Sequence, residues 1–300
     1  MCDSRILICI LFSVCGLTTA SAWADELCPD PTKKAAAQAQ LAQAQTLQAA
    51  GKLREAYDAA SKIELDCAPP NADGLKKKIA SGVALEAEQK GKLDEAVEWH
   101  ERAGDKSSAS RVISKIVSEK SDDIKAVARA IGFYHAHDDK TQEQAMRTLA
   151  LKNVDKALTA EARNFSTPLK GSLGDLRQAQ EWTFYAQAGQ DRVRARATER
   201  GDVLAKEDSR ASLKKAMDYY FVAEVKEGMA RVKAKAAGLG KQAEAKGELE
   251  VAAEYYQIAD EGAKASAVSA QAEASKQKAE ESRKKTFKKD QGDLEKALGF

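Results

Sequence analysis

The sequence predicts an all-α protein in which antiparallel helical hairpins stack into an α-solenoid, followed by a long charged C-terminal helix. The chain has only 5 prolines and 6% aromatic residues, and it is rich in Ala, Glu, Lys, Gln and Leu, which favour helices. A short phrase of about a dozen residues also recurs along it, with apolar residues at helical spacing. Repetition of one helical unit is typical of a stacked array.

The first 24 residues predict a secretory signal peptide. Arg5 precedes an apolar run over residues 6–17, which is too short to cross a bilayer as a helix. Small residues follow in "TTASAWA", which predicts cleavage after Ala22 or Ala24. We therefore expect an exported protein. No later run is long and apolar enough for a transmembrane span, so we expect none in the mature chain.

Cysteine usage predicts a disulfide. Of the 5 cysteines, those at positions 2, 9 and 15 belong to the signal peptide, which leaves Cys28 and Cys67 in an oxidising compartment. Cys28 precedes the first helix of the first expected hairpin, and Cys67 follows the second helix. Because the start of one helix lies beside the end of its antiparallel partner, we expect the two Cα atoms within about 7 Å.

The repeated phrase predicts where the second helix of each hairpin begins. It reads "GKLREAYDAASKI" at 51–63, "GKLDEAVEWHERA" at 91–103 and "GELEVAAEYYQIA" at 247–259, with further copies at 174 and 211 and a partial copy at 292. Gly ends one helix, since it readily adopts the left-handed conformation. Leu follows two residues later, Ala five later and usually an aromatic residue eight later, on one helical face. The predicted packing residues are Leu53, Ala56, Leu93, Ala96, Trp99, Leu176, Ala179, Trp182, Leu213, Ala216, Tyr219, Leu249, Ala252 and Tyr255.

These positions resemble the second helix of the tetratricopeptide repeat family. Successive copies lie 40, 83, 37, 36 and 45 residues apart, against 34 in that family. The first helices match less well, and only Leu239 and Gly240 reproduce the family's Leu-Gly step. The resemblance implies a superhelix that binds a partner, with first helices lining the concave surface. A coiled coil is the structural alternative, although the glycines argue against one continuous rod.

Breaks in the pattern suggest three parts in the mature chain. Pro168 and two glycines in "RNFSTPLKGSLGD", residues 163–175, predict the strongest internal boundary. We therefore expect an N-terminal helical-repeat lobe at 25–165, further helical repeats at 166–262, and a charged helix at 263–300.

The sequence shows no recognisable catalytic or cofactor-binding motif, so we predict a protein that is not an enzyme and has no cofactor. His135, His137, Asp138 and Asp139 are candidate metal ligands by residue type. Residues two apart point in different directions on a helix, however, and a helix end explains the cluster equally well, so we assign no metal. His100 stands where other copies have Tyr, which indicates packing.

The charge balance excludes one class of partner and leaves another open. A net charge of +2, from 48 basic and 46 acidic residues, argues against nucleic-acid binding. The stretch from Lys276 to Lys289 is locally basic. It is either a solvated helix face or a contact with an anionic envelope polymer or lipid surface.

We therefore expect an exported helical-repeat scaffold that binds a partner protein or peptide in the cell envelope. The resemblance to exported repeat proteins favours the periplasm, with secretion as the alternative. Two other functions remain open: a glycan-binding or glycan-cleaving envelope protein, and a structural helical spacer.

Overall fold

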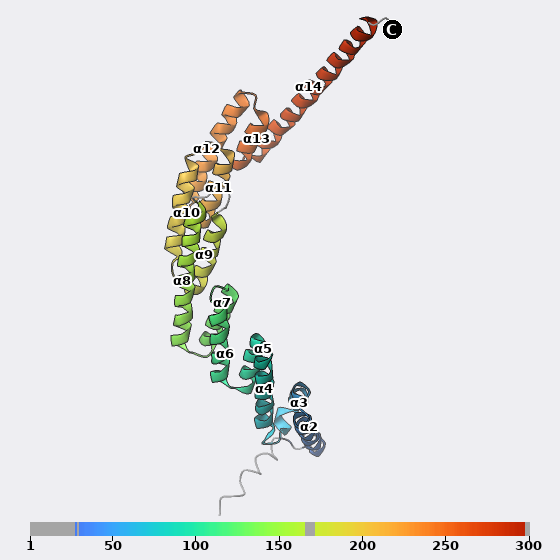
Figure 1. Ribbon diagram of the computed structural model, residues 1–300, viewed down its shortest axis with the longest axis vertical. Helices are drawn as coiled ribbons and strands as arrows, with labels where there is room; N and C mark the ends of the chain where they lie inside the picture. Colours follow the sequence, from blue (N-terminus) through green and yellow to red (C-terminus); the bar gives the residue numbers. More distant parts are fainter. Residues whose placement is uncertain (1–27, 29, 166–171, 298–300) are drawn as a thin grey trace, which may run out of the picture. The chain divides into compact units, whose positions relative to one another are not determined.

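The computed structural model describes residue 28 and residues 30–165 and 172–297 (Figure 1). Within these ranges it contains thirteen α-helices, one short 3-10 helix and no strand, so the all-α prediction is confirmed for the described residues. The predicted signal peptide, residues 1–24, lies outside them. None of the described helices combines the length and the apolar character needed to cross a membrane.

The chain divides into two compact units between His137 and Asp138. Unit 1 contains α2 (Pro31–Ala49), α3 (Leu53–Ser61), η1 (Leu65–Cys67), α4 (Ala72–Gln89), α5 (Leu93–Ala103), α6 (Lys106–Glu119) and α7 (Ile124–Ala136). Unit 2 contains α8 (Lys140–Phe165), α9 (Leu173–Ala186), α10 (Gln190–Ala205), α11 (Arg210–Ala223), α12 (Lys226–Ala245), α13 (Leu249–Ile258) and α14 (Gly262–Ala297). Within each unit, helices that are neighbours in the sequence pack against each other.

The boundary expected after residue 165 falls inside unit 2. Helices α8 and α9, which lie on either side of it, pack against each other. Pro168 itself lies outside the described residues. A helix-breaking segment thus separates two packed helices here, and such a segment does not by itself mark a border between compact units.

Glycines of the repeated phrase end helices at three of the predicted turns. Gly51, Gly91 and Gly247 have φ values of 75°, 70° and 78°, and the next helix begins two residues later each time. The left-handed conformation is easy for Gly, which lacks a Cβ atom. The copies at 174 and 211 differ, because α9 and α11 begin at Leu173 and Arg210, one residue before the start of the phrase.

All five alanines at the fifth position after the first residue of the phrase have no exposed surface. These are Ala56, Ala96, Ala179, Ala216 and Ala252. At the neighbouring Leu positions, Leu176 and Leu213 are fully buried, whereas Leu53, Leu93 and Leu249 are half-buried. Small buried side chains let helix axes approach closely, and this is where each second helix meets its neighbours.

The aromatic positions of the phrase are buried in three copies and half-buried in one. Trp99, Trp182 and Tyr219 are buried. Tyr255 is half-buried, and its hydroxyl donates to the carbonyl of Asp208 at 2.7 Å. Its neighbour Tyr256 takes the buried place, so the core of α13 is centred one residue later than the phrase predicts.

The residue nine places after the first residue of the phrase makes a polar contact that recurs between packed helices. In three copies its buried side chain hydrogen-bonds to an acidic side chain on the preceding helix. The three contacts are His100 to Glu88 at 2.7 Å, Tyr220 to Asp202 at 2.5 Å and Tyr256 to Glu244 at 2.7 Å. Each gives a buried polar group a partner, which limits the cost of taking that group out of water.

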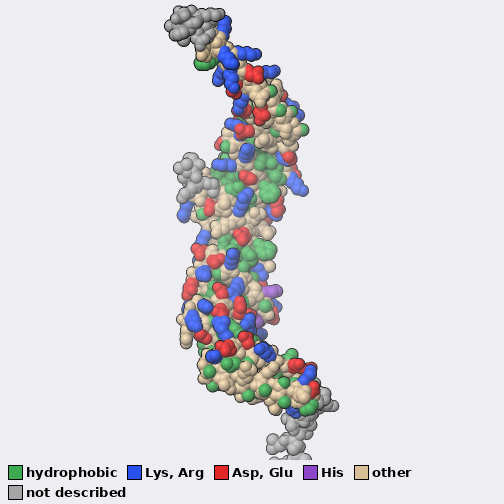
Figure 2. All heavy atoms as spheres, turned by 90° about the vertical axis from the view of Figure 1, so that its right-hand side faces the viewer, with side chains coloured by type: hydrophobic (Ala, Val, Ile, Leu, Met, Phe, Trp, Pro, Cys, Tyr) green, Lys and Arg blue, Asp and Glu red, His purple; other side chains and the backbone are tan. Residues whose placement is uncertain are grey.

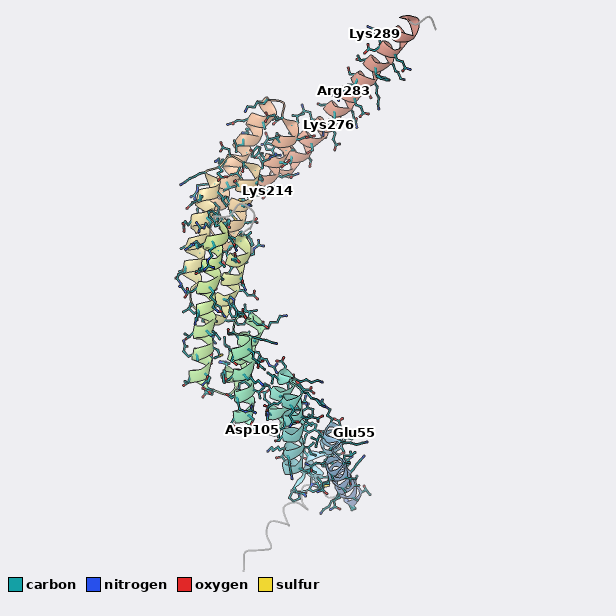
Figure 3. All side chains as sticks on the ribbon, in the orientation of Figure 1. Glu55, Asp105, Lys214, Lys276, Arg283 and Lys289 are labelled. Carbon is teal, nitrogen blue, oxygen red and sulfur yellow. A yellow bond between two sulfur atoms is a disulfide. The ribbon has the colours of Figure 1, made fainter. Side chains whose placement is uncertain are left out.

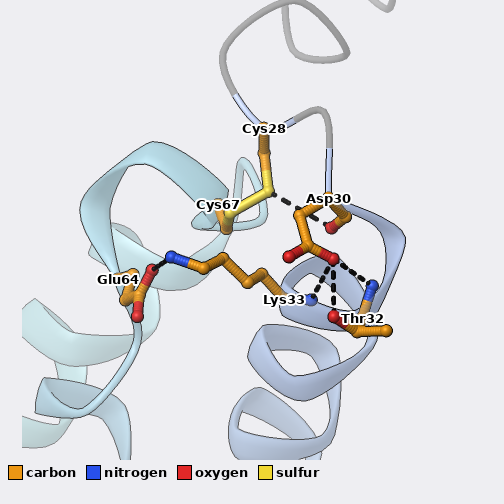
Figure 4. Close-up of a disulfide and its surroundings, with 6 residues drawn as sticks. All are labelled: Cys28, Asp30, Thr32, Lys33, Glu64 and Cys67. Atoms are coloured by element: carbon orange, nitrogen blue, oxygen red, sulfur yellow. Dashed lines mark hydrogen bonds and ion pairs between the residues drawn. A yellow bond between two sulfur atoms is a disulfide. The ribbon is translucent and has the colours of Figure 1, made fainter.

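The first two helices of unit 1 are joined at their open end by Cys28 and Cys67 (Figure 4). Their Cα atoms are 5.0 Å apart, and the two sulfurs lie at bonding distance, so the predicted pairing is confirmed. Both side chains are buried. The two cysteines are 39 residues apart in sequence, and the loop that they close contains α2 and α3.

Polar contacts beside the disulfide fix the start of α2 (Figure 4). Asp30 caps the helix, accepting hydrogen bonds from the backbone N–H of Thr32 at 2.9 Å and from its hydroxyl at 2.5 Å. Lys33 forms an ion pair with Glu64 at 3.0 Å, just before η1. The hydrogen bonds from Thr32 lower the pKa of the Asp30 carboxyl, because they favour its charged form.

Candidate interaction surface

Two phenylalanines on unit 2 are exposed although aromatic side chains usually lie in the core. Phe184 on α9 is 73% exposed, and Phe221 on α11 is 71% exposed. Both stand ten residues after the first position of their copy of the phrase. Isolated exposed apolar residues are common, but two large ones at equivalent positions of neighbouring copies indicate a surface with a role.

The two side chains point outward because their helices bury another face. On α9, Trp182 and Thr183 are 2% and 1% exposed, and Phe184 is the next residue around the helix. On α11, Tyr219 and Tyr220 are buried in the same way. Figure 2 shows hydrophobic patches on the face of unit 2 where α9 and α11 lie.

A small cavity lies beside Phe184. It has a volume of about 190 Å³ and is bordered by residues of α9 and α10 and by the end of α11. Thr183, Phe184, Val193 and Val222 contribute to its wall. An apolar side chain of a partner could enter it beside the phenylalanine ring, as in the buried centre of an interface.

The rim of the cavity is polar and carries both charges. Arg194 forms an ion pair with Glu224, and Gln180 and Gln190 supply amide groups. Glu224 has a φ of 59° at the end of α11, which turns its side chain back toward α10. An apolar centre with a polar rim is the usual anatomy of a protein–protein contact.

A basic side chain precedes each exposed phenylalanine by seven residues. Arg177 lies on α9 and Lys214 on α11, both exposed. A spacing of seven places each on the same helical face as its phenylalanine. Figure 3 shows Lys214 on α11. Among the described residues neither side chain has an ion-pair partner, so both charges are available to a ligand.

A buried ion cluster joins α8 to α10 in unit 2. Glu161 of α8 has no exposed surface, and its carboxylate accepts hydrogen bonds from Arg200 at 2.9 Å and Arg196 at 3.2 Å. The Arg200 guanidinium also lies 4.0 Å from the centre of the Phe165 ring. The buried carboxylate of α8 thus pairs with two arginines of α10, and the cluster holds the two helices together.

The tyrosines behind the surface have shifted pKa values with identified causes. Burial raises the pKa of Tyr219, whose hydroxyl is hydrogen-bonded to Ser172. Burial also raises the pKa of Tyr220, and its hydrogen bond to the Asp202 carboxylate adds to that effect. Both phenols are therefore neutral over the ordinary pH range and act as packing groups, and Tyr220 also donates a hydrogen bond to Asp202.

No protein-family model matches the chain, and no curated protein matches it. The candidate surface therefore depends on its geometry alone.

The four candidate metal ligands have structural contacts of their own. In unit 1, His137 ends α7, where its ring lies 4.4 Å from that of Phe133 and its Nε2 lies 3.4 Å from a carboxylate oxygen of Glu101. His135 lies in the last turn of α7. Across the described part of the chain, no group of three or more His, Cys, Asp or Glu side chains is placed to hold a metal ion.

The two aspartates belong to the start of unit 2. Asp138 has a left-handed φ of 55° and lies 3.6 Å from the Lys140 ammonium. Asp139 accepts a hydrogen bond from the backbone N–H of Gln142 at 3.1 Å, which caps α8. Their position in a turn before a helix explains both residue types.

Phe184 and Phe221 are not among the packing or site residues that the sequence predicts. Helical periodicity assigns aromatic residues to the buried face, and both lie next to residues that are buried. A usable signal was present, however. Only the copies at 174 and 211 combine a basic residue at the third position with Phe at the tenth.

Proposed function

We propose that the protein is an exported helical-repeat scaffold that binds a partner protein or peptide in the cell envelope. Its contact surface is the outward face of α9 and α11, which carry the repeated phrase and are thus second helices, in place of the first helices that the tetratricopeptide resemblance implies. The observation that carries this proposal is the pair of equivalent phenylalanines, 73% and 71% exposed, of which Phe184 borders a cavity with a polar rim. Export is proposed from the N-terminal sequence, and the periplasm from the resemblance to exported repeat proteins.

The charges on this face define the kind of segment that fits. Arg177 and Lys214 each lie about two helical turns from a phenylalanine on the same face. A partner that places apolar side chains on Phe184 and Phe221 would therefore be favoured by acidic residues next to them. We propose an amphipathic helix or extended segment with apolar anchors and flanking Asp or Glu.

A stacked repeat architecture would suit such a segment. The recurring phrase and the alanines without exposed surface support a tetratricopeptide-like arrangement of hairpins, which we propose as the organisation of each unit. In such an array equivalent residues recur along one face, so a partner segment can make the same contact twice.

A glycan-cleaving enzyme is less well supported. A groove of about 610 Å³ along α8 and α10 has two carboxylates, Asp155 and Glu199, among its lining residues. Asp155 lies 2.5 Å from Arg192, and Glu199 lies 3.6 Å from Arg196. Each carboxylate is thus held in an ion pair with an arginine, and this contact does not mark either one as the proton donor that glycoside hydrolysis needs. A passive spacer, in turn, does not explain the exposed phenylalanines.

Photo-crosslinking in the native envelope tests the proposal. A photoreactive amino acid is placed at 184 or at 221 and, as matched controls, at Gln178 or Lys215. The controls are exposed positions on the same two helices, about 120° away from the phenylalanines. We expect one protein to be captured from 184 and 221 but not from 178 and 215, through a peptide with acidic residues beside apolar ones.

A second variant separates binding from folding. Phe184→Ser with Phe221→Ser should abolish co-purification of that protein and leave the melting temperature unchanged, since both rings are exposed. Equal capture from all four positions, or binding that survives the double substitution, would contradict the proposed surface.

A further inference from the structure

The outer part of α14 extends beyond the helices that it packs on, and Lys276 near its start forms an ion pair with Glu250 of α13. Its first turns pack on α13 through Ala265, Val268 and Ala272, which are buried. From Glu273 to Gln291 every side chain is exposed. Figure 3 shows Lys276, Arg283 and Lys289 in succession along this part of the helix.

A basic and aromatic cluster lies in this exposed part. Residues 283–289 read "RKKTFKK", with basic residues at five of seven positions and no acidic residue. Phe287 stands among them with 70% of its surface exposed. On the helix, Arg283 and Lys284 lie one turn before Phe287 on the same face, and Lys288 is its immediate neighbour.

We propose that this cluster, Arg283–Lys289, binds the surface of an anionic lipid bilayer. The cations would lie at the level of the charged headgroups, and the Phe287 ring would enter the boundary between headgroups and acyl chains. This assignment does not rest on the proposed function, because α14 lies apart in sequence from the α9 and α11 surface.

The composition of the helix favours a lipid surface over other occupants. A second copy of the chain is disfavoured, because the only apolar residues from 273 to 291 are Ala274, Ala279 and Phe287, which do not form a heptad stripe. A soluble polyanion would use the charges alone. An exposed aromatic ring among cations gains the most binding free energy at a lipid surface, because the cations contact the anionic headgroups while the ring is buried in the apolar layer beneath them.

Co-sedimentation with vesicles tests the proposal on the chain without residues 1–24. Vesicles of phosphatidylcholine with phosphatidylglycerol are compared with vesicles of phosphatidylcholine alone, at low and high salt. We expect binding to the anionic vesicles only, and weaker binding as salt rises, since exposed charges are screened within about 10 Å at 0.1 M. Binding to the neutral vesicles as well, or no binding to either, would overturn the assignment.

Matched variants assign the binding to these residues. The variant K284Q, K285Q, K288Q and K289Q should lower the partition onto anionic vesicles about a hundredfold or more. The control K62Q, K78Q, K120Q and K125Q removes the same charge from exposed sites of unit 1 and should retain most of the binding. Equal loss in both variants would mean that net charge alone drives adsorption, and the proposal would fail.

Phe287 distinguishes a membrane from a soluble polyanion. Phe287→Trp should show a blue-shifted emission on anionic vesicles, beyond that of the unsubstituted chain, and Phe287→Ser should weaken vesicle binding. Heparin and single-stranded DNA serve as soluble polyanions. If they bind as tightly as the vesicles, and Phe287→Ser changes neither interaction, the ligand is a polymer and the lipid assignment is wrong.

Discussion

The ring of Tyr220 is fully buried against two glycines of different helices. A Cβ atom on Gly201 of α10 would lie 2.8 Å from the ring, and one on Gly228 of α12 would lie 2.5 Å from it. Such distances are shorter than carbon atoms tolerate, so a methyl group at either position would displace the ring or the helix. These two glycines therefore let three helices meet at one aromatic side chain.

Gly228→Ala should destabilise unit 2 by about 1–3 kcal/mol, because the added methyl group overpacks the contact with Tyr220. The matched control is Gly238→Ala on the same helix, where an added Cβ meets nothing within 4 Å. That substitution should stabilise by about 0.5–1 kcal/mol, since Ala favours a helix interior over Gly. Urea unfolding measures both, and shifts of the same sign would contradict the contact.

Tyr256 should titrate only in strong alkali. Its hydrogen bond to Glu244 and its burial raise the pKa of the phenol to about 12, above the ordinary value of about 10. The unfolded chain thus loses this proton first, so the stabilisation is complete below about pH 10 and is lost as the pH rises toward 12. Tyr256→Phe should show less loss of stability over that range when unfolding free energies are compared. A loss equal to that of the unsubstituted chain would count against the Glu244 contact.

At the scale of single elements, α6 depends on a charged cap. The Asp105 carboxylate accepts hydrogen bonds from the backbone N–H of Ser108 at 3.0 Å and from the hydroxyl of Ser107 at 2.8 Å. These bonds, the Ser108 backbone first, lower the pKa of the Asp105 carboxyl to about 2. The lowered pKa means that the cap is strongest when Asp105 is charged.

The contribution of Asp105 should therefore be present above about pH 4 and disappear as the pH falls toward 2. Asp105→Ala should cost about 0.5–2 kcal/mol at neutral pH. Asp105→Asn keeps an accepting oxygen that does not titrate, so the difference between it and the unsubstituted chain should shrink on acidification. Urea unfolding at several pH values checks this, and a difference that is constant from pH 6 to pH 2 would rule out the charged cap.

The sequence predicted that these segments are helices better than it predicted the residue at which each helix begins. The Gly-x-Leu step correctly marked the starts of α3, α5 and α13, because a left-handed glycine ends one helix and the next begins at the Leu. The copy that begins with Ala211 in place of Gly misplaced α11, which starts at Arg210 because Ser209 caps it by accepting a hydrogen bond from Ser212 N–H at 3.1 Å. A side-chain cap of this kind can start a helix at any nearby residue, and periodicity does not detect it.

Periodicity also could not predict which aromatic residues form the candidate surface. Adjacent residues of a helix are about 100° apart, so the apolar period cannot decide which of two neighbouring aromatic residues faces the core. The phrase pointed to Tyr255, whereas Tyr256 is buried. It also gave no reason to expect Phe184 or Phe221 outside, since exposure depends on which neighbouring helix covers each face.

At the scale of the whole molecule, we expect the disulfide to stabilise unit 1 and not unit 2. It lies wholly within unit 1, and the loop that it closes holds only α2, α3 and η1. Replacing both cysteines by Ser should destabilise unit 1 by about 3–4 kcal/mol in the chain-entropy estimate. Amide hydrogen exchange should show faster exchange in α2 and α3, while α10 to α13 keep their protection. Equal loss of protection in both units would contradict the assignment of the bridge to unit 1.

The local position of this bridge also bears on the order of events during synthesis. All groups that it joins lie within the first 67 residues, and the contacts between α2 and α3 need no later part of the chain. Contacts that are close in sequence form early, and N-terminal segments emerge first. Helices α2 and α3 can therefore pack, and bring the two cysteines together, before unit 2 has been synthesised, so each later helix is added to an end whose two sulfurs already lie side by side.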